Sequence, residues 1–168
     1  MTLAVLVGAA IAWRFVDVDP LSSLAVAIPH RATISAQYAY AASRDTEEAW
    51  ASVIDYFSNS SGDRKASATD QRYVQTAKQQ LARWYLEQFQ TEKAVPLLQD
   101  LTRLEDSEEY LRAFGYAGLV IAESQLGHFQ EARAAADKLA PLRDMFLQES
   151  EADSFLRDSL ARAEQALQ

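Results

Sequence analysis

Three alanines stand at matching places in the sequence, because the residues around them are spaced alike. Ala132 is preceded by Leu119 at a distance of 13 and followed at 4 and 7 by Ala136 and Leu139. The same offsets recur as Leu81, Ala94, Leu98, Leu101 and as Ala36, Ala49, Val53, Tyr56. In an antiparallel helix pair, a large apolar residue on the first helix meets a small one early in the second, where only Ala or Gly fits. The spacing therefore predicts three helical hairpins.

Composition and periodicity agree with an all-α fold. The 168 residues include only 5 glycines and 4 prolines, and helix-forming Ala, Leu, Glu, Gln and Arg dominate. From Arg31 onwards the pattern predicts helices over 31–43, 46–57, 70–88, 92–104, 107–126, 130–139 and 151–167, with 58–70 as the longest loop. We expect Asp45 with Glu48 to begin the second helix as a capping-box pair, and Gly127 to be a left-handed C′ residue.

The stretch LGHFQEA, residues 126–132, resembles the turn and second helix of the tetratricopeptide repeat (TPR), and residues 31–140 resemble three copies of it. The resemblance implies antiparallel helical hairpins stacked as a short TPR-like α-solenoid, with 151–167 as a C-terminal capping helix. Some features differ from the family. The alanines are 45 and 38 residues apart, Arg44 and Phe89 replace the glycine, and Pro96 lies inside a second helix. An unrelated helical bundle is the alternative.

In the family, the first helix of each pair lines a concave surface that binds an extended peptide or another protein. Carried over by spacing, the exposed candidates on that surface are Tyr38, Ala42, Gln79, Arg83, Glu87, Ala117, Ile121 and Gln125. Of these, the predicted partner-binding residues are Tyr38, Gln79, Arg83, Glu87 and Gln125. The alternatives are solvated helix positions, or core for Tyr38 and Ile121. The tail helix 151–167 could also fill the same groove.

The sequence contains no recognisable catalytic or metal-binding pattern. It has no cysteine, and its two histidines, His30 and His128, are 98 residues apart. The net charge of −8 repels a nucleic-acid backbone. There is no Gly-rich phosphate loop and no nucleophile beside a base. We therefore expect no enzyme activity, cofactor, metal ion or nucleic acid for these residues, although a catalytic domain elsewhere in a longer protein would be compatible with them.

The first 14 residues form a separate, apolar segment. Residues 2–13, TLAVLVGAAIAW, carry no charge, but as a helix they reach about 18 Å against a hydrocarbon core of about 30 Å. Three interpretations stay open: the second half of a transmembrane helix, a signal peptide that lacks its basic start, and an apolar helix packed on the domain. We favour the first, with 15–30 as a connector and 31–168 as the helical domain.

This layout resembles bacterial envelope proteins with one N-terminal anchor and the tails of membrane-anchored bacterial Ser/Thr kinases. It implies a membrane-anchored, non-catalytic module in an aqueous compartment that docks a protein or peptide partner. The alternatives are, most distantly, an enzyme of helical fold acting through Glu, Arg and Tyr side chains, then a soluble chain, and a self-contained structural or oligomerising bundle with no open groove. In the latter case a second copy of the chain would be the partner.

Overall fold

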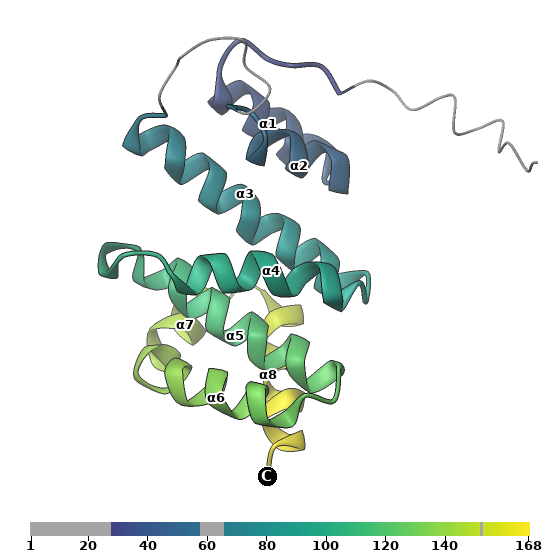
Figure 1. The fold of residues 1–168 in the computed structure, drawn as a ribbon, viewed down its shortest axis with the longest axis vertical. Helices are drawn as coiled ribbons and strands as arrows, with labels where there is room; N and C mark the ends of the chain where they lie inside the picture. The colour runs from purple at the N-terminus through teal and green to yellow at the C-terminus, as the bar shows by residue number, and fades with distance from the viewer. Residues whose placement is uncertain (1–27, 58–65, 152) are drawn as a thin grey trace, which may run out of the picture.

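The computed structural model describes residues 28–57, 66–151 and 153–168, and within these ranges the regular structure is helical, with no strand (Figure 1). The helices are α1 (Ile34–Arg44), α2 (Glu47–Ile54), α3 (Ala68–Glu87), α4 (Thr91–Thr102), α5 (Glu109–Gln125), α6 (Phe129–Leu139), α7 (Arg143–Glu149) and α8 (Ser154–Ala166). Two short 3₁₀ helices, η2 (Asp106–Glu108) and η3 (Ala140–Leu142), precede α5 and α7. The prediction of an all-α fold is confirmed.

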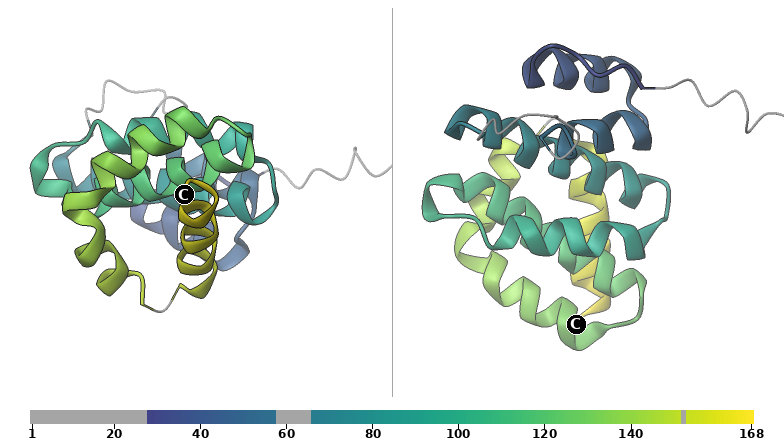
Figure 2. Two further views of the ribbon diagram at one scale, coloured as in Figure 1. Left: turned by 90° about the horizontal axis from the view of Figure 1, so that it is seen from below. Right: turned by 45° about the horizontal axis from the view of Figure 1, so that its top comes forward.

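Helices that follow one another in the sequence pack against one another from α1 to α6. In addition, α1 contacts α3, and α3 contacts α5, so the first helices of the three pairs lie in succession. After α6 the chain turns back, and both α7 and α8 contact α5 (Figure 2). The C-terminal helix α8 therefore lies against the side of the helix pairs that is formed by their first helices, α3 and α5.

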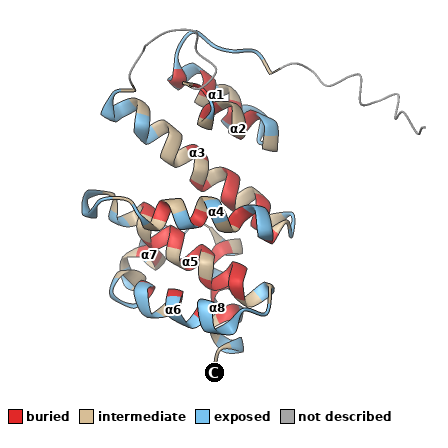
Figure 3. Cartoon of the chain, viewed as in Figure 1, coloured by how far each residue is buried: buried red, intermediate tan, exposed pale blue. Residues whose placement is uncertain are grey.

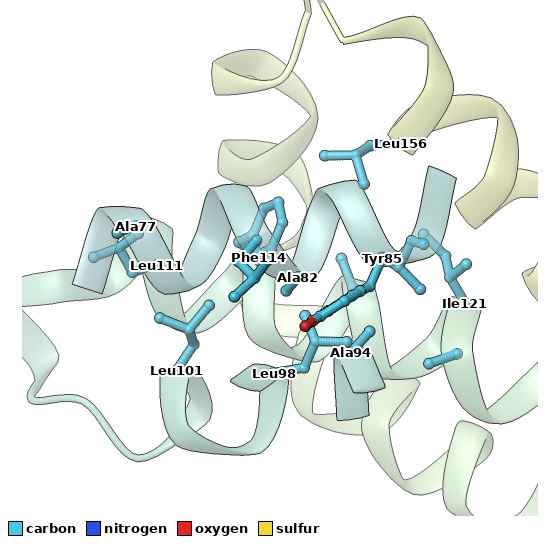
Figure 4. Packing of buried hydrophobic residues seen from close by; sticks show 14 of the residues in the cluster. Ala77, Ala82, Tyr85, Ala94, Leu98, Leu101, Leu111, Phe114, Ile121 and Leu156 are labelled. Atoms are coloured by element: carbon cyan, nitrogen blue, oxygen red, sulfur yellow. The ribbon is translucent and has the colours of Figure 1, made fainter. Parts of the chain in front are cut away.

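The three alanines of the spacing pattern are all at the packing seams. Ala49, Ala94 and Ala132 are each 0% exposed, as expected where two helix backbones approach closely. Figure 4 shows Ala94 and Leu98 of α4 gathered with Ala82 of α3 in the core. The prediction that these three alanines lie at close helix contacts is therefore confirmed.

One seam partner was assigned wrongly. Ala36 is exposed, whereas the next residue, Gln37, is 1% exposed and donates from Nε2 to Oγ of Ser52 in α2 at 2.7 Å. The left-handed turn residue explains the shift. It is Asp45, four places before Ala49, whereas Phe89 and Gly127 each lie five places before their alanines. The first hairpin is one residue shorter, so the offset of 13 does not apply to it.

Two glycines of α5 allow it to approach α4 closely. A Cβ atom added at Gly115 would lie 2.9 Å from the carbonyl oxygen of Leu98 and 3.0 Å from the amide nitrogen of Thr102. One added at Gly118 would lie 2.3 Å from Cδ2 of Leu98. Since Leu98 is 0% exposed, its side chain has no solvent to move into. The contact between the second and third helix pairs therefore depends on both glycines.

Helix ends agree with the sequence predictions in part. Gly127 has φ +78°, so the left-handed C′ prediction is confirmed. The cap of α2 is Thr46, whose Oγ1 accepts from the amide of Ala49 at 3.3 Å, and Asp45 is therefore not the cap. Asp45 instead accepts from Nε1 of Trp50 at 2.8 Å. The short α7 follows Pro141, where the sequence allows a new helix to start, but its range was not predicted.

The N-terminal segment 1–14 lies outside the described residues, as does most of the connector 15–30. Of the helices that the structure does describe, none is both long and apolar enough to cross a membrane. The proposed division into segment, connector and domain stays a prediction.

Candidate partner-binding surfaces

The inner face, which we define as the side of α3 and α5 that α8 covers, carries most of the residues predicted to bind a partner. The residues of α8 that are buried have helical spacing: Leu156, Ser159, Leu160 and Ala163, of which Leu160 is 1% exposed. Ser159 and Ala163 lie next to Ile121 and Ser124 of α5 along a shallow hollow. Figure 3 shows that buried residues run along most of α5. The inner face therefore holds an amphipathic helix.

Arginines bind both ends of α8. At its start, Nε of Arg83 in α3 lies 2.7 Å from Oδ2 of Asp153, the residue whose side chain also caps α8 by accepting from the amide of Leu156. Near its end, Nε and Nη2 of Arg143 donate to the two carboxylate oxygens of Glu164 at 2.9 and 2.8 Å. This hydrogen bonding raises the pKa of Arg143. These charged pairs lie at the two ends of α8, and because their side chains are partly exposed each contributes modestly to holding it.

A third arginine binds the last turn of the tail. Nη2 of Arg133 in α6 donates to the carbonyl oxygen of Leu167 at 2.9 Å. The tail is therefore held from α3, α6 and α7 by polar contacts, in addition to the apolar contact with α5.

Three predicted inner-face residues are buried and not exposed. Ala117 is 0% exposed, Ile121 is 1% and Gln79 is 8%. Gln79 hydrogen-bonds Tyr110. Burial raises the pKa of Tyr110, and the hydrogen bond with Gln79 offsets part of that rise. The expectation of exposure is wrong for Ala117 and Gln79, whereas for Ile121 the alternative of a core position is confirmed. Both α7 and α8 return to this side of the molecule.

Arg83, Glu87 and Tyr38 have partners within the chain. Nη2 of Arg83 lies 2.8 Å from Oε1 of Glu87 one turn along α3, so these two residues lie together beside the start of α8. The ring of Tyr38 lies 5.4 Å from those of Trp50 and Tyr73, and burial raises its pKa. Only Arg83 and Glu87 of the predicted set share one ion-paired cluster.

Gln125 and Ala42 lie elsewhere. Oε1 of Gln125 accepts from Oγ1 of Thr91 at 2.8 Å, at the end of α5 that is next to the α3–α4 turn. Ala42 is exposed on α1. The predicted residues do not line one open groove.

A second surface, which we call the turn edge, consists of the turns between α1 and α2, α3 and α4, and α5 and α6. It carries the two large hydrophobic residues that are exposed among the described residues, Phe89 at 79% and Phe129 at 47%. Both belong to turns that lie at the same end of the helices (right in Figure 1). The sequence shows Phe89 in place of a turn glycine, but it does not show that the ring is exposed.

The turns at Phe89 and Gly127 have the same backbone hydrogen bonds. The amide of Phe89 donates to the carbonyl of Leu86, and that of Gln90 to the carbonyl of Tyr85. The amides of Gly127 and His128 repeat this pattern, donating to Ser124 and Glu123. The pattern is a Schellman motif, which requires a left-handed residue at C′. Phe89 has φ +56° there, a conformation that is unfavourable for a residue with a Cβ atom.

Polar contacts connect neighbouring turns along this edge. Oε1 of Glu47 accepts from the hydroxyl of Tyr85 at 2.8 Å and from Nζ of Lys93 at 3.0 Å. Hydrogen bonds from Lys93 and Tyr85 lower the pKa of Glu47, whereas burial and the hydrogen bond to Glu47 raise the pKa of Tyr85 to about 12. The ion pair is partly exposed, so it contributes modestly to stability.

The described residues contain no group of three or more His, Cys, Asp or Glu side chains that could hold a metal ion. A wide hollow of about 500 Å³ lies at the other end of the helices and includes Arg72 and Arg103. Nε of Arg72 lies 3.2 Å from Oε1 of Glu108, and Nη1 of Arg103 lies 3.4 Å from Oδ1 of Asp100, so both arginines are already paired. Among the described residues that line it, the hollow therefore offers no unpaired cation to an anionic ligand. No protein family, curated protein or solved structure matches this chain.

Proposed function

We propose that this chain is a non-catalytic protein-interaction module that docks an α-helical segment of a protein or peptide on its inner face. In this proposal α8 occupies the site in cis and is displaced when the partner helix binds. The observation that carries the proposal is the seating of α8, an amphipathic helix whose buried side chains are few and small apart from Leu156 and Leu160.

A TPR-like architecture is part of the same proposal. It is supported by the fully buried Ala49, Ala94 and Ala132, by the matching turns at Phe89 and Gly127, and by the contacts of α3 with both α1 and α5. In such stacks, the first helices of successive pairs present a continuous inner face to a ligand. The different spacing of the alanines is accommodated in the connections between pairs.

Membrane attachment is a further part of the proposal and rests on the sequence of residues 2–13. An anchor there would place the helical domain near a membrane surface, with the connector between them. A soluble form of the chain would leave the proposal for the inner face unchanged.

The alternative is a self-contained structural bundle with no open groove. The observation that favours it is the set of arginine contacts that hold α8 at both ends, since Arg83, Arg133 and Arg143 come from three different helices. The two functions differ in whether α8 can be replaced by another helix.

A peptide competition experiment distinguishes them. The variant Leu160→Asp places a charge in the apolar contact of α8 and leaves every residue of the inner face on α3 and α5 unchanged. We expect a fluorescent peptide with the sequence of residues 153–168 to bind this variant saturably, as measured by fluorescence anisotropy. The unaltered chain should bind the peptide at least about tenfold more weakly, because its own α8 competes at a high effective concentration.

The matched control is the same peptide with Asp in place of Leu160, which should not bind. Circular dichroism establishes whether Leu160→Asp is folded, and Leu160→Ala replaces it if it is not. If a folded variant fails to bind the 153–168 peptide, the inner face is not a helix-docking site and the self-contained bundle is the better description.

A further inference from the structure

We propose that the turn edge is a second docking surface, and that its partner is a protein segment with apolar side chains flanked by lysine or arginine. The surface consists of Phe89 and Phe129 with the nearby carboxylates of Glu92 and Glu131. It is independent of the inner face and of whether α8 can be displaced.

Folding does not account for the residue at position 89. Its backbone is left-handed, with φ +56°, where glycine is favoured and where the matching position of the next hairpin is Gly127. Its ring is 79% exposed, so little burial offsets the unfavourable backbone. An aromatic residue that is unfavourable in both respects fits a role in contact with another molecule.

Phe129 adds a second exposed ring in the adjacent turn. It is 47% exposed and is the first residue of α6. The hydrogen bond from Thr91 to Gln125, at 2.8 Å, joins the start of α4 to the end of α5 and so holds the two turns side by side. Two aromatic rings on neighbouring turns provide anchors for apolar side chains of a partner.

The charge of the turn edge indicates the chemistry of that partner. Glu92 and Glu131 are exposed in the first turns of α4 and α6, as is Glu48 in α2, and none of the three forms an ion pair with a described residue. Lys93 is already bound by Glu47 at 3.0 Å. An acidic border around apolar anchors is complementary to lysine and arginine and repels phosphate groups, whether of nucleic acids or of anionic lipids.

Arg44 is the cation that lies closest in sequence to the first of these turns. It is exposed at the end of α1, in the hairpin farthest along the chain from Phe129. It belongs to the first turn of the edge, whereas Phe89 and Phe129 are at the second and third turns.

The test uses the full chain and a defined probe, an 18-residue amphipathic peptide of Leu, Ala and Lys labelled with a fluorophore. A second peptide, with Glu in place of every Lys, is the charge control. We expect saturable binding of the lysine peptide only. Phe89→Gly should weaken it at least tenfold while raising the thermal unfolding midpoint by about 2–4 °C, because glycine relieves the left-handed backbone.

Two charge reversals separate a specific surface from general attraction. Glu92→Lys, on the turn edge, should weaken binding at least tenfold. Glu105→Lys changes the net charge equally in the connection after α4, at the other end of the helices, and should change the affinity less than twofold. Unlabelled 153–168 peptide should not compete, which separates this surface from the inner face.

Three results would overturn the proposal. The first is that Phe89→Gly binds the lysine peptide as tightly as the unaltered chain does. The second is that Glu92→Lys and Glu105→Lys weaken binding equally. The third is that the lysine peptide does not bind, whereas the chain partitions onto phosphatidylcholine vesicles in a way that depends on Phe89. The last result would assign the rings to a membrane surface. A thermal midpoint of Phe89→Gly at or above that of the unaltered chain shows that loss of binding is not due to unfolding.

Discussion

Gly115→Ala is expected to destabilise the chain, although alanine is the better helix former. In the helix interior alanine is favoured over glycine by about 1 kcal/mol. Against this, the new methyl group would lie 2.9 Å from the carbonyl oxygen of Leu98 and 3.0 Å from the amide nitrogen of Thr102. Both atoms belong to the backbone of α4, so the contact cannot be relieved by rotating a side chain.

The expected magnitude follows from these two opposing effects. Overpacking of a well-packed core typically costs about 1–3 kcal/mol. With the gain in helix propensity subtracted, we expect Gly115→Ala to lower the free energy of unfolding by roughly 1 kcal/mol. For a chain of this size that corresponds to a decrease in the midpoint of about 2–4 °C.

Urea denaturation followed by circular dichroism measures this change. Ala134→Gly, at an exposed position of α6, gives the ordinary difference between alanine and glycine in the same protein. Gly118→Ala should be tolerated better in a Leu98→Ala background, because its methyl group meets the Leu98 side chain, whereas Gly115→Ala should not. If Gly115→Ala raised the stability by about the amount that Ala134→Gly lowers it, the close approach of α4 and α5 would be refuted.

Two further predictions concern the turn edge. Gly127→Ala should lower the free energy of unfolding by about 1 kcal/mol through the backbone alone, because φ is +78° and no atom lies within 4 Å of the added Cβ; an unchanged urea midpoint would contradict the left-handed turn. Hydrogen bonds from Lys93 and Tyr85 lower the pKa of Glu47 from its ordinary value of 4.5. The ionised carboxylate therefore stabilises the folded chain above pH 4.5, and this stabilisation is lost as the pH falls through the lower pKa of the folded state. The stability difference between the unaltered chain and Glu47→Gln should therefore shrink below pH 4.5 in urea titrations at several pH values, and a constant difference would contradict the assignment.

Requirements that act over a few residues could be predicted from the sequence. Ala49, Ala94 and Ala132 are recognisable because a close helix contact admits only small residues, and Gly127 because a left-handed C′ residue favours glycine. The error at Ala36 has the same local origin. A turn shortened by one residue moved the buried position to Gln37, and nothing in the spacing of apolar residues marks that change.

The arrangement of the candidate site depends on contacts that spacing does not reveal. The pattern of residues 151–167 predicts an apolar face that could fill the groove, but it does not show that α8 packs mainly on α5. The repeat spacing marks Arg83 as exposed and does not reveal its partner, Asp153, which is 70 positions further along the chain. The pair Gly115 and Gly118 is visible in the sequence as two small residues three apart, yet only the packing of α4 shows why they are needed.

The most direct test of the inner-face account is the position of α8 in solution. Because the chain has no native cysteine, spin labels can be placed selectively through Gln165→Cys on α8 and Gln88→Cys at the end of α3, both exposed. Double electron–electron resonance then reports the distance between the two helices. The account predicts one narrow distance for the chain alone and a broad, longer distribution in excess 153–168 peptide. A narrow distance that stays unchanged at saturating peptide would contradict it.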